Sequence, residues 1–154
     1  LCLPCNAAHA FHEEFREATE GATFVHIVDA VISSLHRLHP QAKRIGLMSV
    51  TGTLAGYVYD RKLQEQGLTI VFPDAMHQAL VMQAVYGPQG IKAGFFVDTH
   101  ELLQHVAHDL KWSGAEVIVL ACTELSLCLT SSVLTLIDST EALAQEVVRV
   151  ARIS

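Results

Sequence analysis

Continuous apolar runs recur along the chain, and each is bounded by polar or turn-forming residues. A run that is apolar throughout is typical of a strand buried on both faces of a parallel sheet. We therefore expect strands at residues 1–4, 23–27, 44–50, 68–72, 115–121 and 133–137.

Segments with the length and boundaries of helices separate these runs. The predicted helices cover residues 6–19, 29–38, 54–66, 74–86, 99–113 and 139–153. Gly67 and Gly114 each follow a predicted helix, and Asp74 stands where a side chain would cap the start of another. Because strands and helices alternate, the fold class is α/β with a parallel sheet.

Composition narrows the class of protein. The chain has 154 residues, of which 51% are hydrophobic and 17% charged, so it forms one domain or part of a larger one around a sizeable core. No apolar run approaches the roughly 20 residues of a membrane span, so we expect no membrane partner. The net charge of −6, with no densely basic stretch, argues against nucleic acid as a partner. Four cysteines without a secretory signal predict a cytoplasmic location.

Cys5 and Cys122 occupy equivalent places in similar segments, residues 1–6 and 118–123. Each follows a predicted strand and precedes a predicted helix start, which is the edge of a parallel sheet where ligands bind. The positive end of a helix gives such a thiol thiolate character, and the unpaired N–H groups there can hold a carboxylate. We therefore predict reactive thiols at both positions.

The same region allows other interpretations. A string with the spacing C-x2-C-x3-H-x2-H is an alternative zinc site and comprises Cys2, Cys5, His9 and His12. Its pairs are closer together than the pairs that wrap a zinc ion in a finger. Cys2 and Cys5 also form a C-x-x-C redox motif, although Cys2 is expected inside a strand. Cys2 and Cys128 are predicted to face the core, and His9 lies one turn after Cys5, close enough to affect its thiol.

Two further segments are candidates for anion binding. Residues 49–53 end a predicted strand and open a helix, so their hydroxyl and N–H groups could bind an anion or simply cap the helix. Lys92 lies in the glycine-rich segment 87–94 and is a candidate partner for a carboxylate.

Taken together, these motifs are similar to those of the cofactor-independent aspartate/glutamate racemase family, and most similar to its aspartate racemase branch. The resemblance rests on PCNAAHAF (4–11), GLMSVTGTLAGYVY (46–59), GIKAG (90–94), ACTEL (121–125) and IDSTEALA (137–144). It runs in the right order over nearly the whole chain. The resemblance implies a Rossmann-like α/β/α domain and an active site between two such domains, each supplying one cysteine.

By resemblance, Cys5 and Cys122 are the two acid/base residues. One thiolate removes the α-proton of an amino acid while the other, as a thiol, protonates the opposite face, without pyridoxal phosphate or metal. Negative charge that develops on the substrate carboxylate must be stabilised by the site. The substrate-binding residues implied for this task are Asn6, Ala7, Ala8, Thr51, Thr53, Lys92, Thr123 and Glu124.

Substitutions within the motifs bear on the substrate. Glu124 stands where glutamate racemases usually have histidine, which favours aspartate. Ala7 and Val50 each replace a threonine that is usual in the family, which removes two hydroxyl groups. Glutamate or a hydantoin therefore remains an alternative substrate, and an inactive remnant that binds a dicarboxylate is an alternative function.

The resemblance also predicts how the chain is organised. Residues 1–20 would be a remnant of the first racemase domain, residues 21–138 the second domain, and residues 139–154 a helix that returns to the first. The family has a glycine-rich loop and a substrate-binding arginine before its first cysteine, so we expect the first domain to be incomplete here. Family members tend to form dimers, which predicts a homodimer.

Overall fold

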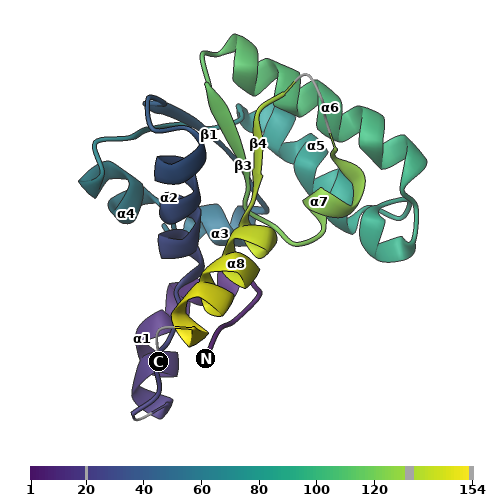
Figure 1. The fold of residues 1–154 in the computed structure, drawn as a ribbon. Helices are drawn as coiled ribbons and strands as arrows, with labels where there is room; N and C mark the ends of the chain where they lie inside the picture. Colours follow the sequence, from purple (N-terminus) through teal and green to yellow (C-terminus); the bar gives the residue numbers. More distant parts are fainter. Residues whose placement is uncertain (20, 131–133, 153–154) are drawn as a thin grey trace.

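The parallel sheet predicted from the apolar runs is present in a computed structural model, which describes residues 1–19, 21–130 and 134–152. The strands run in the order β2-β1-β3-β4, and each neighbouring pair is parallel (Figure 1). Their bounds are β1 (Arg44–Met48), β2 (Thr69–Val71), β3 (Val117–Leu120) and β4 (Leu136–Asp138). The α/β class is therefore confirmed.

Helices cover both faces of this sheet (Figure 1). One layer contains α2 (Ile27–Leu38), α4 (Asp60–Glu65) and α8 (Ser139–Ala151), and the other contains α5 (Ala75–Tyr86), α6 (Val97–Trp112) and α7 (Leu125–Cys128). Successive residues of β3 point into opposite layers: Val117 and Val119 pack in one core cluster, Ile118 and Leu120 in the other. Burial on both sides explains why this strand is apolar at every position.

The predicted helix at 54–66 is two helices in the structure. α3 (Thr51–Ala55) begins earlier than expected, and α4 begins only at Asp60. Tyr57, between them, has a φ of +49°, a left-handed conformation that an α-helix does not contain. Gly56 lies against the N-terminal segment, where an added Cβ would approach the Ala10 Cβ to 2.9 Å. The chain therefore turns here because it packs against a distant segment.

The two strands predicted at 1–4 and 23–27 are wrong. A single parallel bridge joins Cys2 to Val25, and the Val25 N–H donates to the Leu1 carbonyl at 2.8 Å. Pro4 has no N–H to extend such a ladder, and α2 begins at Ile27. The N-terminal segment forms η1 (Ala7–Phe11) and α1 (His12–Ala18) instead, and η2 (Ile91–Ala93) and α7 are further short helices that the pattern did not predict.

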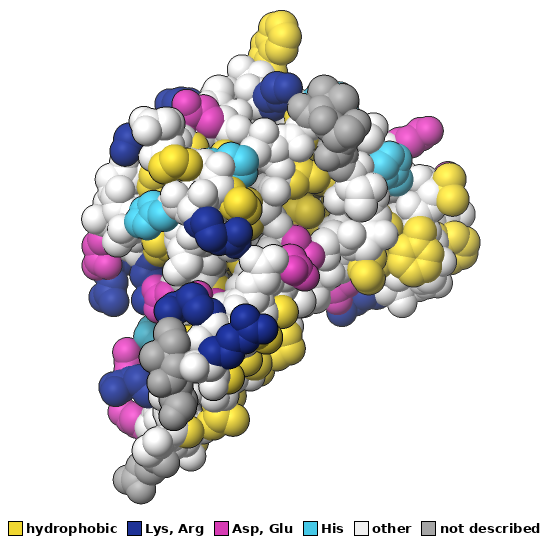
Figure 2. All heavy atoms as spheres, in the orientation of Figure 1, with side chains coloured by type: hydrophobic (Ala, Val, Ile, Leu, Met, Phe, Trp, Pro, Cys, Tyr) yellow, Lys and Arg dark blue, Asp and Glu magenta, His cyan; other side chains and the backbone are white. Residues whose placement is uncertain are grey.

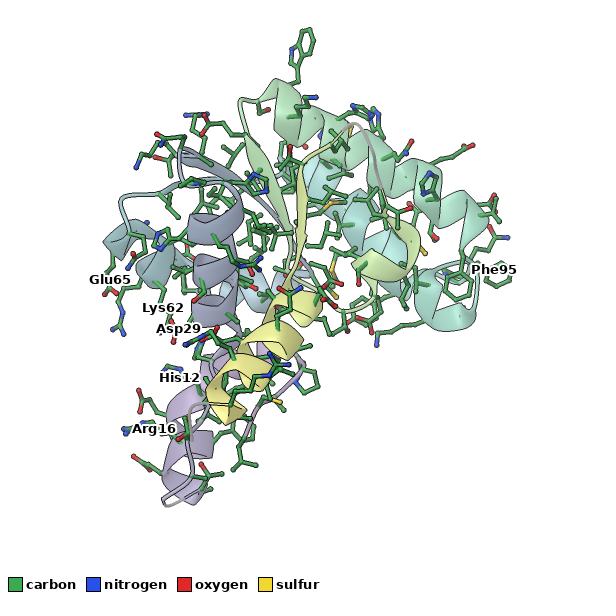
Figure 3. All side chains as sticks on the ribbon, in the orientation of Figure 1. His12, Arg16, Asp29, Lys62, Glu65 and Phe95 are labelled. Carbon is green, nitrogen blue, oxygen red and sulfur yellow. The ribbon has the colours of Figure 1, made fainter. Side chains whose placement is uncertain are left out.

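Large hydrophobic side chains remain exposed at two ends of the molecule. Phe95 and Phe96 lie beside the start of α6, and Phe11 and Phe15 lie on η1 and α1. Figure 3 labels Phe95, and Figure 2 shows hydrophobic side chains gathered over that end and along the projecting N-terminal part. Among the helices of the described residues, none is both long and apolar enough to cross a membrane.

Candidate active site

The carboxyl ends of the central strands meet at one edge of the sheet. Met48 pairs with Leu120, and Leu120 pairs with Asp138, so β1, β3 and β4 end level with one another. The next residue after β1, Ser49, donates from its hydroxyl to the Ala121 carbonyl at 2.7 Å. Cys122, one of the two predicted reactive cysteines, comes two residues after the end of β3 and therefore lies at this edge.

Four of the predicted site residues converge beyond β3. The Cys122 thiol donates to Glu124 Oε2 at 3.1 Å, and the Thr123 hydroxyl donates to the same oxygen at 2.7 Å. The other carboxylate oxygen of Glu124 contacts Lys92 Nζ at 2.5 Å. A thiol, a carboxylate and an ammonium group thus form one connected network.

The η2 turn brings Lys92 to this network. Ile91 is buried and anchors the turn in the core, while Lys92 itself is exposed. Gly94 closes the turn with a φ of +89°, a conformation that glycine adopts without strain, and its N–H donates to the Ile91 carbonyl. Lys92 Nζ also lies 5.5 Å from the centre of the Tyr86 ring, which favours the cation.

The electrostatics keep Cys122 protonated. Burial raises the pKa of the Cys122 thiol to about 12, and the adjacent Glu124 carboxylate acts in the same direction. Burial alone would raise the pKa of Glu124, but hydrogen bonds from Lys92, Thr123 and Cys122 lower it to about 2. The hydrogen bond to Glu124 also raises the pKa of Lys92. At neutral pH the network therefore contains a neutral thiol, a carboxylate and an ammonium group.

Our expectation that a helix start gives thiolate character is wrong for Cys122. The helix that follows, α7, has only four residues and begins at Leu125, beyond Glu124. Its dipole is small, whereas the carboxylate accepts a hydrogen bond from the sulfur itself. The structure makes this thiol a proton donor.

Cys5 is exposed and lies just before η1. Its neighbour Asn6 is buried and donates from Nδ2 to Ser139 Oγ at 3.0 Å. Ser139 in turn donates to the Leu120 carbonyl at 2.8 Å. Because Leu120 ends the strand that leads to Cys122, these bonds bring the segments of both cysteines to the same edge of the sheet.

Tyr59 completes this buried contact and was not predicted from the sequence. Its hydroxyl donates to Asn6 Oδ1 at 2.5 Å, and its side chain is fully buried. Tyr59 and Ser139 both lie within the motifs GYVY and IDST that carried the resemblance. A polar side chain inside such an apolar motif was the signal available, but its partner was not visible in the sequence.

The hydroxyls of α3 lie beside the Cys5 segment. α3 packs on η1, and an added Cβ on Gly52 would lie 3.9 Å from the Ala7 Cβ. Thr53 is buried, and its Oγ1 has no hydrogen-bond partner among the described residues. Thr51 is exposed and accepts from Gln78 Nε2 at 3.3 Å. Thr53 therefore has an unused hydroxyl, and the exposed Thr51 hydroxyl can still donate a hydrogen bond.

Gln78 is a second residue at this edge that the sequence did not predict. Its Nε2 donates to the Ser49 carbonyl at 2.9 Å as well as to Thr51. Oε1 of the same amide is buried without a partner among the described residues. Gln78 thus joins α5 to the turn between β1 and α3.

His9 bonds to the backbone with both ring nitrogens. Nδ1 lies 2.9 Å from the Cys5 carbonyl, and Nε2 accepts from the Ile27 N–H at 3.2 Å. Burial lowers the pKa of His9, which favours a neutral ring that donates from Nδ1. His9 therefore holds the main chain of Cys5 against the start of α2.

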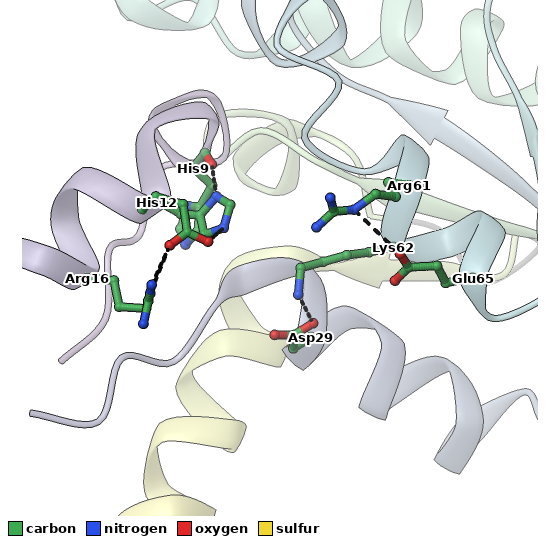
Figure 4. Close-up of polar contacts among 8 residues, drawn as sticks. His9, His12, Arg16, Asp29, Arg61, Lys62 and Glu65 are labelled. Carbon is green, nitrogen blue, oxygen red and sulfur yellow. Dashed lines mark hydrogen bonds and ion pairs between the residues drawn. The ribbon is translucent and has the colours of Figure 1, made fainter.

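Two more histidines adjoin His9 and form a cluster. The His26 ring lies 4.6 Å from that of His9 and 4.9 Å from that of His12, with edge-to-face geometry in both cases. Lys62 lies near this cluster and pairs with Asp29 at 2.6 Å (Figure 4). A cavity of about 270 Å³ opens between the cluster and α4.

The remaining cysteine expectations have mixed outcomes. Cys128 is buried, as predicted, but Cys2 is exposed because the strand expected around it does not form. In the described part of the chain, no group of three or more His, Cys, Asp or Glu side chains is placed to hold a metal ion. The zinc alternative therefore has no support in the geometry.

Fold and site together define an α/β domain with a thiol-centred polar site at the carboxyl edge of its sheet. Residues 1–147 match the model of the family described as Asp/Glu/Hydantoin racemase. The chain belongs to this racemase family.

Similar proteins include two that are named as racemases. The chain is 28% identical over 152 residues to the broad specificity amino-acid racemase RacX of Bacillus subtilis (strain 168), covering 96% of this chain and 63% of that protein. It is 30% identical over 131 residues to an uncharacterized protein of the pnlA 3′ region of Pectobacterium carotovorum, covering 82% of this chain and 84% of that one. The aspartate racemase of Picrophilus torridus superposes with a TM-score of 0.81 at 26% identity, covering 97% of this chain and 61% of that structure. The chain thus spans somewhat less than two thirds of the length of the two named racemases.

Proposed function

We propose that this protein interconverts L- and D-aspartate by cofactor-independent transfer of the α-proton between two cysteines, Cys5 and Cys122. The observation that carries this proposal is the Cys122 thiol held as a donor by Glu124 at the sheet edge. The buried contact of Asn6 with Ser139 brings the Cys5 segment to the same edge. Membership of the racemase family supports the same activity.

In the proposed reaction Cys5 acts first as the base. Its thiolate removes the α-proton, so the Cα–H bond breaks and an S–H bond forms. The Cys122 thiol then donates its proton to the opposite face of the α-carbon and becomes a thiolate. The reverse reaction exchanges these roles, because a group that is the base for one enantiomer is the acid for the other.

The charge that develops during proton removal needs stabilisation at the substrate carboxylate. The first N–H groups of a helix have no acceptor within the helix, and η1 presents such groups at Ala7 and Ala8 next to Cys5. We assign these N–H groups, with that of Asn6 and with Thr123, to one carboxylate of the substrate. Thr53 Oγ1, which is buried without a partner among the described residues, can add a hydrogen bond.

Lys92 is the proposed partner of the second carboxylate. It pairs with Glu124, and both its ammonium group and the carboxylate are within reach of solvent. An entering dicarboxylate would compete with Glu124 for this cation. The position of Glu124, where a histidine is usual in glutamate racemases, supports aspartate as the substrate.

A racemase of wider specificity is the second candidate. Ala7 and Val50 lack hydroxyl groups that the family usually has, so fewer polar groups select the substrate side chain. Similarity to RacX, a broad specificity amino-acid racemase, supports this alternative. Glutamate and hydantoins are alternative substrates that the same assay can compare with aspartate. Binding of a dicarboxylate without turnover is the alternative in which the protein is not a catalyst.

Proton NMR in D2O tests the proposal directly. The α-proton signal of L-aspartate should disappear in the presence of the protein. Conversion of L- to D-aspartate, followed by chiral analysis of the same samples, should be lost in both Cys122→Ala and Cys5→Ala, because inversion requires an acid and a base. Cys2→Ser is the matched control, because Cys2 is an exposed cysteine outside the site, and it should keep the wild-type rate. Exchange of other amino acids at equal or higher rates would replace aspartate by the broader specificity. Absence of exchange with every amino acid and hydantoin would refute the racemase proposal.

Domain organisation, assembly and location are proposed on the same basis. We propose that residues 1–20 belong to a first racemase domain, residues 21–138 to the second, and residues 139–154 to a helix that returns to the first. We also propose that the protein acts as a homodimer in the cytoplasm.

A further inference from the structure

The main-chain ladder of the sheet positions only one of the two cysteines. Cys122 follows β3, which pairs with β1 on one side and β4 on the other. The segment before Cys5 has only the single bridge between Cys2 and Val25. His9 holds the Cys5 main chain against α2, and side chains that join the Cys5 segment to the end of β3 set its position relative to Cys122.

A chain of three buried side chains makes this connection. Tyr59 donates to Asn6 Oδ1 at 2.5 Å, and Asn6 Nδ2 donates to Ser139 Oγ at 3.0 Å. Ser139 donates to the carbonyl of Leu120 at 2.8 Å. Asn6 is 3% exposed, and Tyr59 and Ser139 are fully buried.

The donor and the acceptor of each of these three hydrogen bonds can be assigned. A carbonyl only accepts, so the Ser139 hydroxyl must give its proton to Leu120 and accept from Asn6. Asn6 then presents Oδ1 to Tyr59, which must be the donor. Burial raises the pKa of Tyr59, so its hydroxyl keeps the proton that it donates. Hydrogen bonds in a buried network are stronger than in water, so these bonds hold the three side chains in one arrangement.

We propose that Tyr59 and Ser139 are positioning residues for the two-cysteine reaction and act through Asn6. They hold the residue next to Cys5 against the strand that leads to Cys122, so that the two sulfurs stay on opposite sides of one α-carbon. This inference rests on the proposed racemase function. It assigns neither residue a contact with the substrate.

Kinetics of Tyr59→Phe test this assignment. The variant keeps the ring but leaves Asn6 Oδ1 without its donor, so we expect kcat for α-proton exchange to fall about tenfold or more, as small misplacements of reacting groups do. The KM should change less than kcat, because Lys92 and Thr123, which lie outside the Cys5 segment, still hold the carboxylates. Tyr57→Phe is the matched control: it removes a tyrosine hydroxyl two residues away on a side chain that is 74% exposed, and it should leave kcat unchanged.

A second measurement is independent of catalysis. In a Cys2→Ser, Cys128→Ser background, only Cys5 and Cys122 can be joined by bifunctional thiol reagents of increasing span. We expect one reagent of short span to cross-link the parent efficiently. In Tyr59→Phe the yield with this reagent should fall, and the yield with reagents of longer span should rise. Mass spectrometry of the joined peptides would identify the product.

The outcomes separate the two proposals. If the parent exchanges no α-proton, the racemase function fails, and the cross-linking pattern alone decides whether Tyr59 positions Cys5. If Tyr59→Phe does not fold, Ser139→Ala removes the hydrogen bond on the other side of Asn6 and is judged by the same measurements. A folded variant with wild-type kcat and wild-type cross-linking would overturn the positioning role.

Discussion

Glu124 sets the protonation state of Cys122 through a single contact. A carboxylate that accepts from the thiol stabilises the neutral sulfur and opposes its ionisation, in addition to the effect of burial. Removing the charge in Glu124→Gln should therefore lower the pKa of Cys122. We expect alkylation of Cys122 at mildly alkaline pH to become faster by about tenfold for each pKa unit of the change.

Peptide mass spectrometry after timed iodoacetamide treatment would measure this rate. Alkylation of Cys2 in the same sample is the internal control, since Cys2 is exposed and remote from Glu124 in the sequence. An unchanged or slower Cys122 rate in Glu124→Gln would show that the carboxylate does not govern this thiol.

His26 links the stability of the N-terminal half to pH. Its Nδ1 accepts from the Val28 N–H and caps α2, and burial lowers its pKa from 6.5 to about 3. The unfolded chain therefore binds a proton below about pH 6.5 that the folded chain does not bind until about pH 3. The stability that the neutral ring provides is complete above the unfolded pKa and is lost as the pH falls.

His26→Asn should weaken this pH dependence. Asparagine is a good N-cap and has no titrating group, so α2 keeps its cap. We expect the fall in unfolding free energy between about pH 7 and about pH 5 to be smaller by about 1–2 kcal/mol than in the parent. Urea denaturation at both pH values would measure it, and equal slopes in the two proteins would contradict the assignment.

At the scale of elements, the packing of β1 against β3 and the turn before it depends on the absence of a side chain. A Cβ on Gly46 would lie 3.0 Å from the Ala115 Cβ and 3.2 Å from Ile118 Cγ1, within the packed core. Gly46→Ala should therefore destabilise the fold by about 1–3 kcal/mol through overpacking. In Gly52→Ala the nearest atom would be 3.9 Å away, so we expect no loss of stability. Thermal denaturation of both variants would check this, and equal effects would argue against the close contact.

Elements differ in how far the sequence predicted them. The strands at 44–50, 68–72 and 115–121 were found, because burial on both faces makes each of them apolar throughout. The capping side chain at Asp74 marked the start of α5 one residue later. The break between α3 and α4 was not predicted, since it arises where Gly56 packs against Ala10 from another part of the chain.

At the scale of the whole molecule, exposed hydrophobic surface bears on assembly. Phe11 is 60% exposed and Phe15 is 38% exposed, both on the projecting N-terminal segment. If this surface takes part in the proposed homodimer, Phe11→Ser with Phe15→Ser should shift the protein toward monomer in sedimentation velocity. Trp112→Ser is the control, because Trp112 is 93% exposed at the far end of α6. The same distribution of species in all three proteins would exclude the N-terminal surface from the interface.

In the candidate site, too, residues close together in the sequence were predicted, whereas properties that depend on distant contacts were not. Cys122, Thr123 and Glu124 are adjacent in the sequence, so their motif could be recognised, and Lys92 was found by its glycine-rich turn. The proton-donor state of Cys122 was not predicted, because burial and the orientation of the Glu124 carboxylate are properties of the folded chain.

The sequence by itself determined the α/β class, the racemase family and the cysteines on which the proposed reaction depends. Each of these can be recognised from short segments, because periodicity and motif spacing are local properties of the sequence. Only the tertiary structure decided that the Cys5 segment is not a strand and that Tyr59 and Ser139 hold Asn6 beside the end of β3. Tyr59 lies 53 positions after Asn6 in the sequence, and Ser139 lies 133 positions after it. Hydrogen bonds over such separations depend on packing that no local pattern contains.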